Sequence, residues 1–267
     1  MDQPKKSLGQ HWLNDTSALE AITEAAEIKP TDTVLEVGPG LGTLTQHLVR
    51  QAQHVVAVEF DEKLAATLPQ RISAKNLRVI QADILHFNLE DLPTHYKVVA
   101  NIPYYLTSNL LRHLSESLNP PYLMVLLLQK EVAQRVAAGP GQMSLLSVSV
   151  QLFYRAELGL QLPAELFTPP PKVDSQVVIL RRHAKPLFKD LDDKVFFRLV
   201  KAGFSERRKK LRSSLSAGLN ITKDEADRLL NRSEINGDLR AQNLSLEQWH
   251  RLYTEFQVKN NLGSLLS

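Results

Sequence analysis

Short apolar runs alternate with amphipathic segments from Thr33 to about Arg182, and this alternation constrains the fold more than any other feature of the chain. Segments such as Leu44–Gln51 and Glu62–Ile72 carry apolar residues at helical spacing. The runs between such segments have the length of buried strands, and they are Thr33–Val37, His54–Val58, Leu77–Ile80, Lys97–Asn101 and Tyr122–Leu128. Strands separated by helices are typical of βαβ units, so we expect an α/β domain built on a parallel sheet.

Further elements complete this domain, and a second one follows it. Ser144–Phe153 and Gln176–Leu180 predict later strands, and Asn14 or Asp15 can cap a helix that runs to about Ile28. After Pro186 no convincing strand occurs, and the helical segments are KVFFRLV, ERRKKLRSSL, KDEADRLLN and LEQWHRLYTEF. The sequence therefore predicts an α/β domain of residues 1–185 and a small helical domain of residues 186–267.

Composition excludes several classes of site. The chain contains 0 Cys, which excludes disulfides, thiolate metal sites and cysteine nucleophiles, and its 8 His show no paired ligand spacing, so we expect no metal. The longest apolar stretch, Leu123–Leu128, is too short to cross a bilayer, and the start of the sequence has no targeting pattern. We therefore expect a cytoplasmic protein without a membrane partner and, since no long exposed apolar face is indicated, a monomer. The net charge of +3 is compatible with an RNA partner but does not demand one.

The first predicted strand runs into the sequence GPGLG, which contains Gly38, Gly40 and Gly42. Glycines at this position allow a tight turn and let a ligand approach the backbone where a helix begins. The spacing differs from the G-x-G-x-x-G of dinucleotide-binding folds. Glu36, just before the loop, would repel a pyrophosphate more readily than a cationic ammonium group.

Two more carboxylates follow at the ends of successive predicted strands. Glu59 ends the second strand, where an acidic group can accept hydrogen bonds from both ribose hydroxyls, and Asp83 follows the third, where it can accept one from an adenine amine. A structural turn with surface carboxylates would explain each feature alone. Together with the glycine loop they favour a nucleoside cofactor.

The fourth predicted strand ends in the tetrapeptide Asn101-Ile102-Pro103-Tyr104. An adenine N6 is a poor nucleophile because its lone pair is delocalised into the ring. The Asn101 Oδ1 and the Ile102 carbonyl can accept its two N–H groups, localise the lone pair and aim it at a methyl donor. Pro103 stiffens the turn, Tyr104 offers a ring for base stacking, and the base must leave its RNA context to reach them. A plain exit from a strand into a turn is the alternative for such a tetrapeptide seen alone.

The ordered motifs resemble the family of ribosomal RNA adenine N6,N6-dimethyltransferases and, within it, the bacterial small-subunit branch. The resemblance covers nearly the whole chain. Its motifs are SLGQHWLND, VLEVGPGLGTLT, VVAVEFD, QADIL, ANIPYYLTS, LLLQKEVAQRVAAGPG, ELFTPPPKVDSQVV and FSERRKKLRSSL. The resemblance implies a Rossmann-like S-adenosylmethionine-dependent methyltransferase sheet with a small C-terminal helical domain. It also implies methylation of N6 on two adjacent adenosines in a hairpin of small-subunit (16S) rRNA, within the pre-assembled small ribosomal subunit and with a role in subunit biogenesis.

The resemblance assigns expected cofactor contacts. It implies Gly38 in the cofactor loop, Glu59 on the ribose, Asp83 on the adenine and Asn101 at the junction of cofactor and target base. It adds two N-terminal contacts, His11 and Leu13. At this point the chain departs from the family, whose members commonly have Gln-Asn-Phe-Leu where this chain has Gln-His-Trp-Leu at residues 10–13.

The role of Phe167, in the motif FTPPPKVDS, stays open. The resemblance implies that its ring lies near the target base and stacks on it, as Tyr104 is expected to do. The alternative is a core aromatic residue beside a rigid proline loop.

One short stretch of the predicted helical domain is strongly basic. Val200, Phe204, Leu211 and Leu215 recur at helical spacing and can face the core, which leaves the charges outward. We expect RNA contacts from Arg207, Arg208, Lys209, Lys210 and Arg212. A solvated surface is the alternative, because charge runs usually have no partner.

Two rivals to a small-subunit methyltransferase remain at this point. The first is the related large-subunit rRNA methyltransferase that confers macrolide resistance, against which FTPPPKVDS and the small C-terminal domain argue. The second is a ribosome-assembly or transcription factor that kept the fold and binds nucleic acid without catalysis. The intact tetrapeptide of residues 101–104 argues against lost activity.

Overall fold

The computed structural model describes residues 10–189 and 191–264, which form two compact units. The sheet unit extends to Ala137 and includes Tyr154–Arg182, and the helical unit comprises Ala138–Phe153 and the chain from His183 onward. The predicted domains differ from these units because they assign Ala138–Phe153, and also residues 183–185, to the first domain. Val148 and Leu152 of this segment are buried in one apolar cluster with Phe196, which explains why it belongs to the helical unit.

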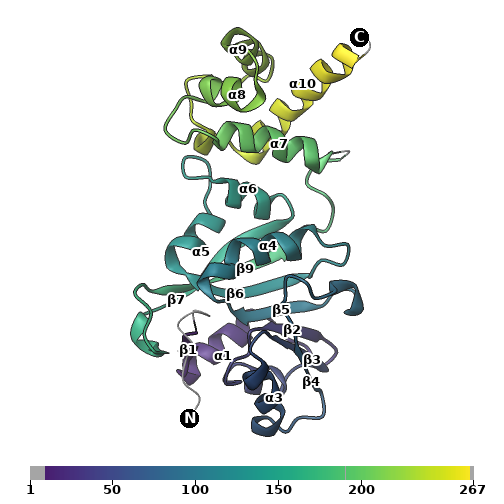
Figure 1. Ribbon diagram of the computed structural model, residues 1–267, viewed down its shortest axis with the longest axis vertical. Coiled ribbons are helices and arrows are strands. Elements are labelled where there is room, and N and C mark those ends of the chain that lie inside the picture. Colours follow the sequence, from purple (N-terminus) through teal and green to yellow (C-terminus); the bar gives the residue numbers. More distant parts are fainter. Residues whose placement is uncertain (1–9, 190, 265–267) are drawn as a thin grey trace. The chain divides into compact units, whose positions relative to one another are not determined.

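The sheet unit is built on a mostly parallel seven-stranded sheet (Figure 1). The strands of the chain are β1 (Trp12–Leu13), β2 (Thr33–Val37), β3 (His54–Glu59), β4 (Leu77–Gln81), β5 (Lys97–Asn101), β6 (Leu123–Gln129), β7 (Tyr154–Leu162), β8 (Phe167–Thr168) and β9 (Ser175–Arg182). The order in the large sheet is β4-β3-β2-β5-β6-β9-β7. The neighbours from β4 to β6 pair in parallel, whereas β9 pairs antiparallel with both β6 and β7. The predicted α/β architecture is confirmed, and the five predicted parallel strands differ from the observed ones by at most one residue at either end.

The prediction for Ser144–Phe153 is wrong, because this segment forms helix α6 (Leu145–Gln151) rather than a strand. The Ser144 and Ser147 side chains form a capping box, in which each accepts a hydrogen bond from the backbone N–H of the other. The strand β7 begins only after this helix, at Tyr154, and was not predicted.

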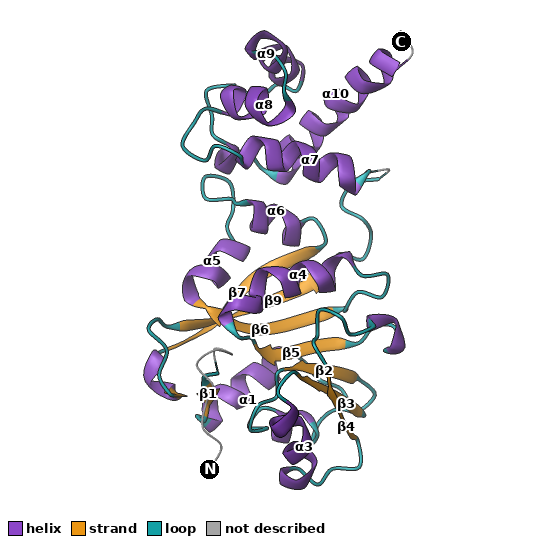
Figure 2. Cartoon of the chain, in the orientation of Figure 1, coloured by secondary structure: helices purple, strands orange, loops and turns teal. Residues whose placement is uncertain are grey.

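The helices of the sheet unit lie on both faces of the sheet (Figure 2). They are α1 (Thr16–Ala25), α2 (Thr45–Leu48), α3 (Glu62–Arg71), α4 (Thr107–Glu116) and α5 (Lys130–Val136). In this view α1 and α3 lie on one face, and α4 and α5 lie on the other. The Asp15 side chain caps α1 by accepting the N–H of Ala18 at 2.8 Å, so one of the two predicted caps is the observed one.

A separate two-stranded sheet joins the N-terminal segment to a distant loop. Strand β1 pairs antiparallel with β8, with Trp12 opposite Thr168 and Leu13 opposite Phe167. Leu13 and Phe167 are both buried in the core that covers one face of the large sheet. This long-range pairing fixes the backbone of residues 11–13 beside the glycine loop.

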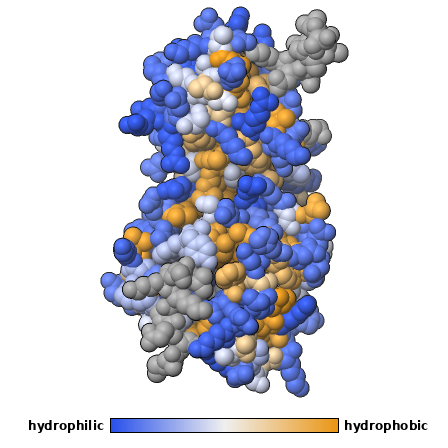
Figure 3. Space-filling view, in the orientation of Figure 1, coloured by the Kyte–Doolittle hydropathy of each residue, from blue (hydrophilic) through white to orange (hydrophobic). Residues whose placement is uncertain are grey.

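The helical unit contains α6 and four further helices around one apolar core. The other four are α7 (Asp193–Phe204), α8 (Leu211–Leu219), α9 (Lys223–Arg232) and α10 (Leu246–Ser264). Trp249, which is fully buried, packs against Gly203 at the centre of this core. Within residues 10–189 and 191–264, no helix is long and apolar enough to cross a membrane. Hydrophilic side chains cover much of the face drawn in Figure 3, and apolar ones show between them.

Candidate active site

A cavity of about 360 Å³ lies where the strands β2, β3 and β5 end. The N-terminal segment, the glycine loop, the loop after β4 and the tetrapeptide of residues 101–104 line it. Such a volume suits a small molecule of nucleoside size. The cavity therefore brings together the cofactor-binding and catalytic residues expected in the sheet unit, whereas Phe167, expected to stack on the target base, does not line it.

The glycine loop follows β2 with a backbone that favours glycine. Gly38 and Gly40 have φ angles of +66° and +57°, a region that residues with a Cβ rarely occupy. The N–H of Gly38 donates to the Val58 carbonyl at 2.9 Å, which ties the loop to the end of β3. The loop is therefore held in a fixed conformation where it lines the cavity.

Glu59 ends β3 and is almost fully buried. One carboxylate oxygen accepts the N–H of Gly40 at 3.0 Å, and the other accepts the N–H of Asp61 at 2.9 Å. Burial raises the pKa of this carboxyl, while the two backbone N–H groups act in the opposite direction. Each oxygen keeps a further lone pair, so the fixed carboxylate can still accept hydrogen bonds from a ligand in the cavity.

Glu36, which precedes the loop, is a buried carboxyl with an unsatisfied oxygen. It is 1% exposed, and its Oε2 has no hydrogen-bond partner among the described residues. Burial raises the pKa of Glu36 to about 8, the nearby Thr45 hydroxyl acts in the opposite direction, and the Glu59 carboxylate adds to the rise. The group is therefore largely protonated at neutral pH unless a cation approaches it.

Replacing Glu36 with Gln is expected to flatten the dependence of stability on pH. The native Glu36 retains its proton up to about pH 8, whereas the unfolded chain releases it above pH 4.5. The native state then binds more protons than the unfolded state between these values, so the free energy of unfolding falls as pH rises through this window, by up to about 1.4 kcal/mol per pH unit. Gln keeps the shape of the side chain and removes the titration.

Urea unfolding of both proteins at pH 5, 6.5 and 8 measures this difference. The urea concentration at the midpoint of unfolding should fall for the wild type relative to the variant as pH rises toward 8. Above pH 8 the midpoints of the two proteins should change in parallel. Equal pH profiles for the two proteins would contradict the burial argument.

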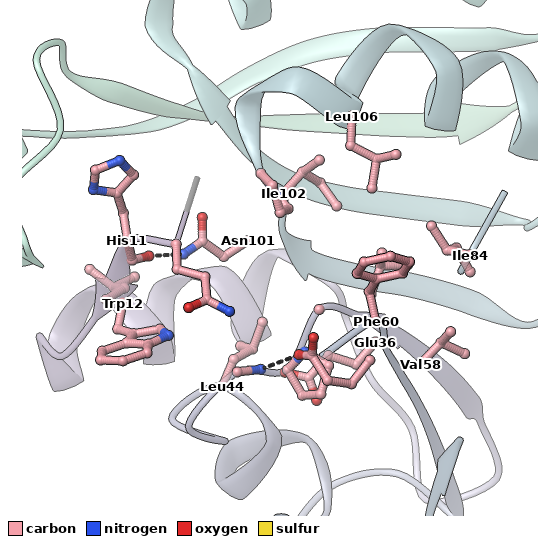
Figure 4. Close-up of a pocket in the computed structure, with 18 of the residues that line it drawn as sticks. His11, Trp12, Glu36, Leu44, Val58, Phe60, Ile84, Asn101, Ile102 and Leu106 are labelled. Carbon is pink, nitrogen blue, oxygen red and sulfur yellow. Dashed lines mark hydrogen bonds between the residues drawn. The ribbon is translucent and has the colours of Figure 1, made fainter. Parts of the chain in front are cut away.

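Asp83 follows β4 and lines the cavity next to Ile84, which Figure 4 labels. Its Oδ1 accepts the N–H of Leu85 at 3.0 Å, and its Oδ2 lies 3.3 Å from Nδ1 of His86. The negative charges of Asp83 and Glu59 both raise the pKa of Tyr105, after a larger contribution from its partial burial. Asp83 is thus oriented by the loop, and its side chain remains partly exposed.

Asn101, the last residue of β5, is held by the N-terminal segment. Its Nδ2 donates to the main-chain carbonyl of His11 at 3.0 Å (Figure 4, dashed line). This hydrogen bond uses one of the two N–H groups of the amide and orients the side chain, and Oδ1 is left as an available acceptor. The contact spans ninety residues of sequence and uses the His11 backbone, so it does not depend on which side chain stands there.

The rest of the tetrapeptide is fixed by neighbouring elements. The N–H of Ile102 donates to the Leu127 carbonyl of β6 at 3.1 Å. The Tyr104 hydroxyl and the Ser175 Oγ are hydrogen-bonded at 3.1 Å, and the His11 ring stacks on the Tyr104 ring with centroids 5.8 Å apart. The His11 ring is in turn anchored by a 2.7 Å contact between its Nδ1 and the Pro169 carbonyl. One face of Tyr104 is thus already occupied by His11.

Phe167 does not line this cavity. It is 3% exposed and packs in the core cluster that also contains Leu13. This position favours the core alternative that the sequence left open. Leu13, although equally buried, does line the cavity.

The basic stretch lies in the helical unit and is less uniform than its sequence indicates. Its first residues occupy a turn between α7 and α8 rather than a continuous helical face, because α7 ends at Phe204 and α8 begins at Leu211. Arg207 and Arg208 are exposed and make no ion pair with any described residue. The other members of the stretch are paired: Lys209 with Glu206, Lys210 with Asp238, and Arg212 with Asp227 and Asp238.

The sequence analysis missed several cavity-lining residues, among them four with aromatic or amide side chains. They are Gln10, Trp12, Phe60 and Tyr105. Phe60 and Tyr105 are 54% and 62% exposed, although both are large aromatic side chains. Phe60 directly follows the predicted Glu59, and Tyr105 directly follows the predicted Tyr104. The signal that the sequence offered for both was therefore their position next to a predicted site residue. For Trp12 the signal was the departure from the Phe that the family commonly has at this position.

Comparisons with known proteins identify the family of the chain. A profile of the family described as "Ribosomal RNA adenine dimethylase" matches residues 1–258. Ribosomal RNA small subunit methyltransferase A of Dehalococcoides mccartyi is 43% identical, over 94% of this chain and 89% of the relative. The protein of the same name from Alkaliphilus metalliredigens is 38% identical, over 95% of this chain and 92% of the relative.

Two solved structures are similar over almost their whole length. A dimethyladenosine transferase from Plasmodium falciparum has a TM-score of 0.81 and 27% identity, and the match covers 94% of this chain and 98% of that one. The 23S rRNA methyltransferase ErmE has a TM-score of 0.74 and 28% identity, and the match covers 92% of this chain and 99% of that one. The fold therefore occurs in proteins named for different ribosomal RNAs, whereas the two curated relatives are named for the small subunit.

Proposed function

The chain belongs to the ribosomal RNA adenine dimethylase family, and we propose that its residues 101–104 present the N6 of two adjacent adenosines in a 16S rRNA hairpin for methylation. It is an S-adenosylmethionine-dependent rRNA (adenine-N6,N6)-dimethyltransferase, and its product is N6,N6-dimethyladenosine. The observation that carries the catalytic proposal is the orientation of the Asn101 amide, which donates one N–H to the His11 carbonyl and keeps Oδ1 available as an acceptor.

The cavity fits the cofactor on its own chemistry. Glu36 offers an unsatisfied acceptor for an ammonium group, Glu59 offers fixed acceptors for ribose hydroxyls, and Asp83 offers an acceptor for an adenine amine. S-adenosylmethionine, when bound, supplies an electrophilic methyl group on its sulfonium. We assign Gly38 to the cofactor loop, and His11 and Leu13 to the wall of the cavity beside Asn101.

The tetrapeptide acts on the target base. The Asn101 Oδ1 and the Ile102 carbonyl accept the two N6–H groups, which localises the nitrogen lone pair and aims it at the methyl donor. The base stacks on the face of Tyr104 that His11 leaves open, since His11 covers the other. The nitrogen loses its proton after methyl transfer, so the mechanism requires no general base. Phe167 contributes to the core that supports this region rather than to stacking.

The RNA contacts are assigned to the helical unit. We assign the main phosphate contacts to Arg207 and Arg208, because their charges are exposed and unpaired among the described residues. Lys209, Lys210 and Arg212 contribute to the positive potential of the stretch but are partly neutralised by their ion pairs.

The setting of the reaction is also part of the proposal. We propose that the enzyme acts as a monomer in the cytoplasm, on rRNA already assembled into the small subunit, with a role in subunit biogenesis. The family assignment and the small-subunit names of the relatives support the substrate. Light scattering at micromolar concentration tests the monomer, and a dimeric mass would overturn that part alone.

Methyl transfer to defined substrates tests the function. Labelled S-adenosylmethionine is incubated with under-methylated small subunits, naked 16S rRNA or large subunits, and the RNA is then digested to nucleosides. We expect labelled N6,N6-dimethyladenosine from small subunits. Product from large subunits alone would favour the large-subunit rival. Binding of RNA with neither cofactor binding nor transfer would favour a non-catalytic assembly factor.

A further inference from the structure

Trp12 places a polar atom without a partner in the wall of the cavity. Its Nε1 is closed to solvent and has no hydrogen-bond partner among the described residues. Strand β1 holds the residue with Leu13 directed into the core, so the Trp12 side chain points to the other side, as successive side chains of a strand do. Figure 4 shows the indole with its nitrogen on the side that faces the other labelled lining residues.

The edge of the indole lies directly on the glycine loop. A Cβ placed on Gly40 would lie 3.0 Å from Nε1 and 3.2 Å from Cδ1 of Trp12, so only glycine leaves room for this contact. Trp12 as a whole is partly exposed. Its N–H edge therefore lies where the glycine loop borders the cavity.

The charges around the cavity create a need for such a donor. Glu36, Glu59 and Asp83 line it, and none of the described lining residues is Lys or Arg. The amino-acid part of S-adenosylmethionine carries a carboxylate, which must be met by neutral N–H groups in this setting. Two nearby donors are already used, because one N–H of the Asn101 amide donates to the His11 carbonyl and the backbone N–H of Gly40 donates to Glu59.

The cavity contains a complementary pair of unsatisfied atoms. Among its described lining residues, the buried side-chain atoms without a partner are the acceptor Glu36 Oε2 and the donor Trp12 Nε1. An α-amino acid group brings one cation and one anion, which satisfy one of these atoms each. A buried N–H group without a hydrogen-bond partner lowers the stability of the protein. The Trp12 indole therefore destabilises the ligand-free protein, and a ligand that accepts a hydrogen bond from it removes this cost.

On the premise of the proposed function, we propose that the Trp12 Nε1–H donates a hydrogen bond to the carboxylate of the methionine part of the cofactor. Trp12 is then a further cofactor-binding residue of this chain. The Phe that the family commonly has at this position fills similar space but cannot make this bond.

The variant Trp12→Phe tests the proposal, with binding measured by titration calorimetry. S-adenosylhomocysteine carries the carboxylate, and 5′-methylthioadenosine lacks the whole amino-acid part. We expect the variant to bind S-adenosylhomocysteine about ten- to a hundredfold more weakly, the loss expected for one hydrogen bond to a charged group, and methylthioadenosine with unchanged affinity. The melting temperature of the ligand-free variant should be no lower than that of the wild type, because the removed N–H has no partner there.

Trp249→Phe is the matched control. It makes the same chemical change at a buried indole whose Nε1 also has no partner, but in the core of the helical unit. It should leave both ligand affinities unchanged. Equal losses for the two ligands in Trp12→Phe, or no loss for either, would overturn the role of Trp12 while the enzyme assignment stands. A wild-type protein that binds neither ligand would overturn the proposed function together with it.

Discussion

Asn101→Ala is expected to lower kcat/KM for methyl transfer by roughly a hundred- to a thousandfold, the scale observed when one preorganised polar group is removed from an active site. In the proposed mechanism the Asn101 Oδ1 is the side-chain acceptor that holds N6 in line with the methyl donor, and the amide is oriented by the 3.0 Å hydrogen bond to His11. Alanine removes the acceptor and leaves the backbone of β5 unchanged. RNA affinity should remain within about twofold of wild type, because the assigned phosphate contacts lie in the helical unit.

Two companion variants make this result specific. Asn101→Asp retains an acceptor but faces the His11 carbonyl with a carboxylate, so its orientation is lost and its activity should also fall. Asn109→Ala removes the same side chain from an exposed position on α4 and should retain full activity. Methyl transfer by single turnover and RNA binding by filter retention measure the two effects separately. Full activity of Asn101→Ala would refute the proposed role of the amide.

The architecture of the sheet unit could be predicted because each parallel strand is a short run of apolar residues in the sequence, as is typical of a buried strand. Residues such as Val34, Val98 and Val125 are fully buried, and their strands are flanked by loops and helices with distinct patterns. The pattern fails at Ser144–Phe153, where a short apolar run fits both a strand and a helix. The choice there depends on the Ser144 cap and on packing against α7, neither of which local hydrophobicity encodes.

Some residues of the site could likewise be predicted from local sequence patterns, whereas others are positioned by pairing between distant segments. Glu59, Asp83 and Asn101 could be placed because each lies at or just beyond the end of a predicted strand, and the ends of parallel strands meet at one edge of the sheet. The position of Trp12 depends on the pairing of β1 with β8, which joins segments more than 150 residues apart. No local pattern predicts such a pairing; the family resemblance indicated His11 and Leu13 at the site, whereas the position of Trp12 comes from the structure.

In the basic stretch, ion pairs decide which of the cations are available to bind RNA. All five expected RNA contacts look alike in the sequence, but Lys210 and Arg212 share Asp238, which keeps the pKa of that carboxyl below its usual value. These two cations therefore hold the start of α8 to the loop before Ala241. Arg207 and Arg208 have no such partner among the described residues, so their charge is available to phosphates.

Reversing both of these charges, as Arg207→Glu with Arg208→Glu, is expected to weaken RNA binding by about a hundredfold near 0.1 M salt. Each lost phosphate contact also removes about 0.7–0.9 from the slope of log affinity against log salt concentration, so the slope should become shallower by about 1.5. Affinity for S-adenosylhomocysteine should be unchanged, because neither arginine lines the cavity.

The matched control is Lys223→Glu with Arg228→Glu, which makes the same change in net charge at exposed positions of α9. If phosphate binding is local to the turn after α7, this control should lose far less RNA affinity than the double arginine variant. Equal losses would mean that only the overall charge of the helical unit matters. A loss of cofactor affinity in the arginine variant would mean that the turn supports the fold instead. The salt titration separates these cases, because only a contact with phosphates changes the slope in proportion to the number of cations removed.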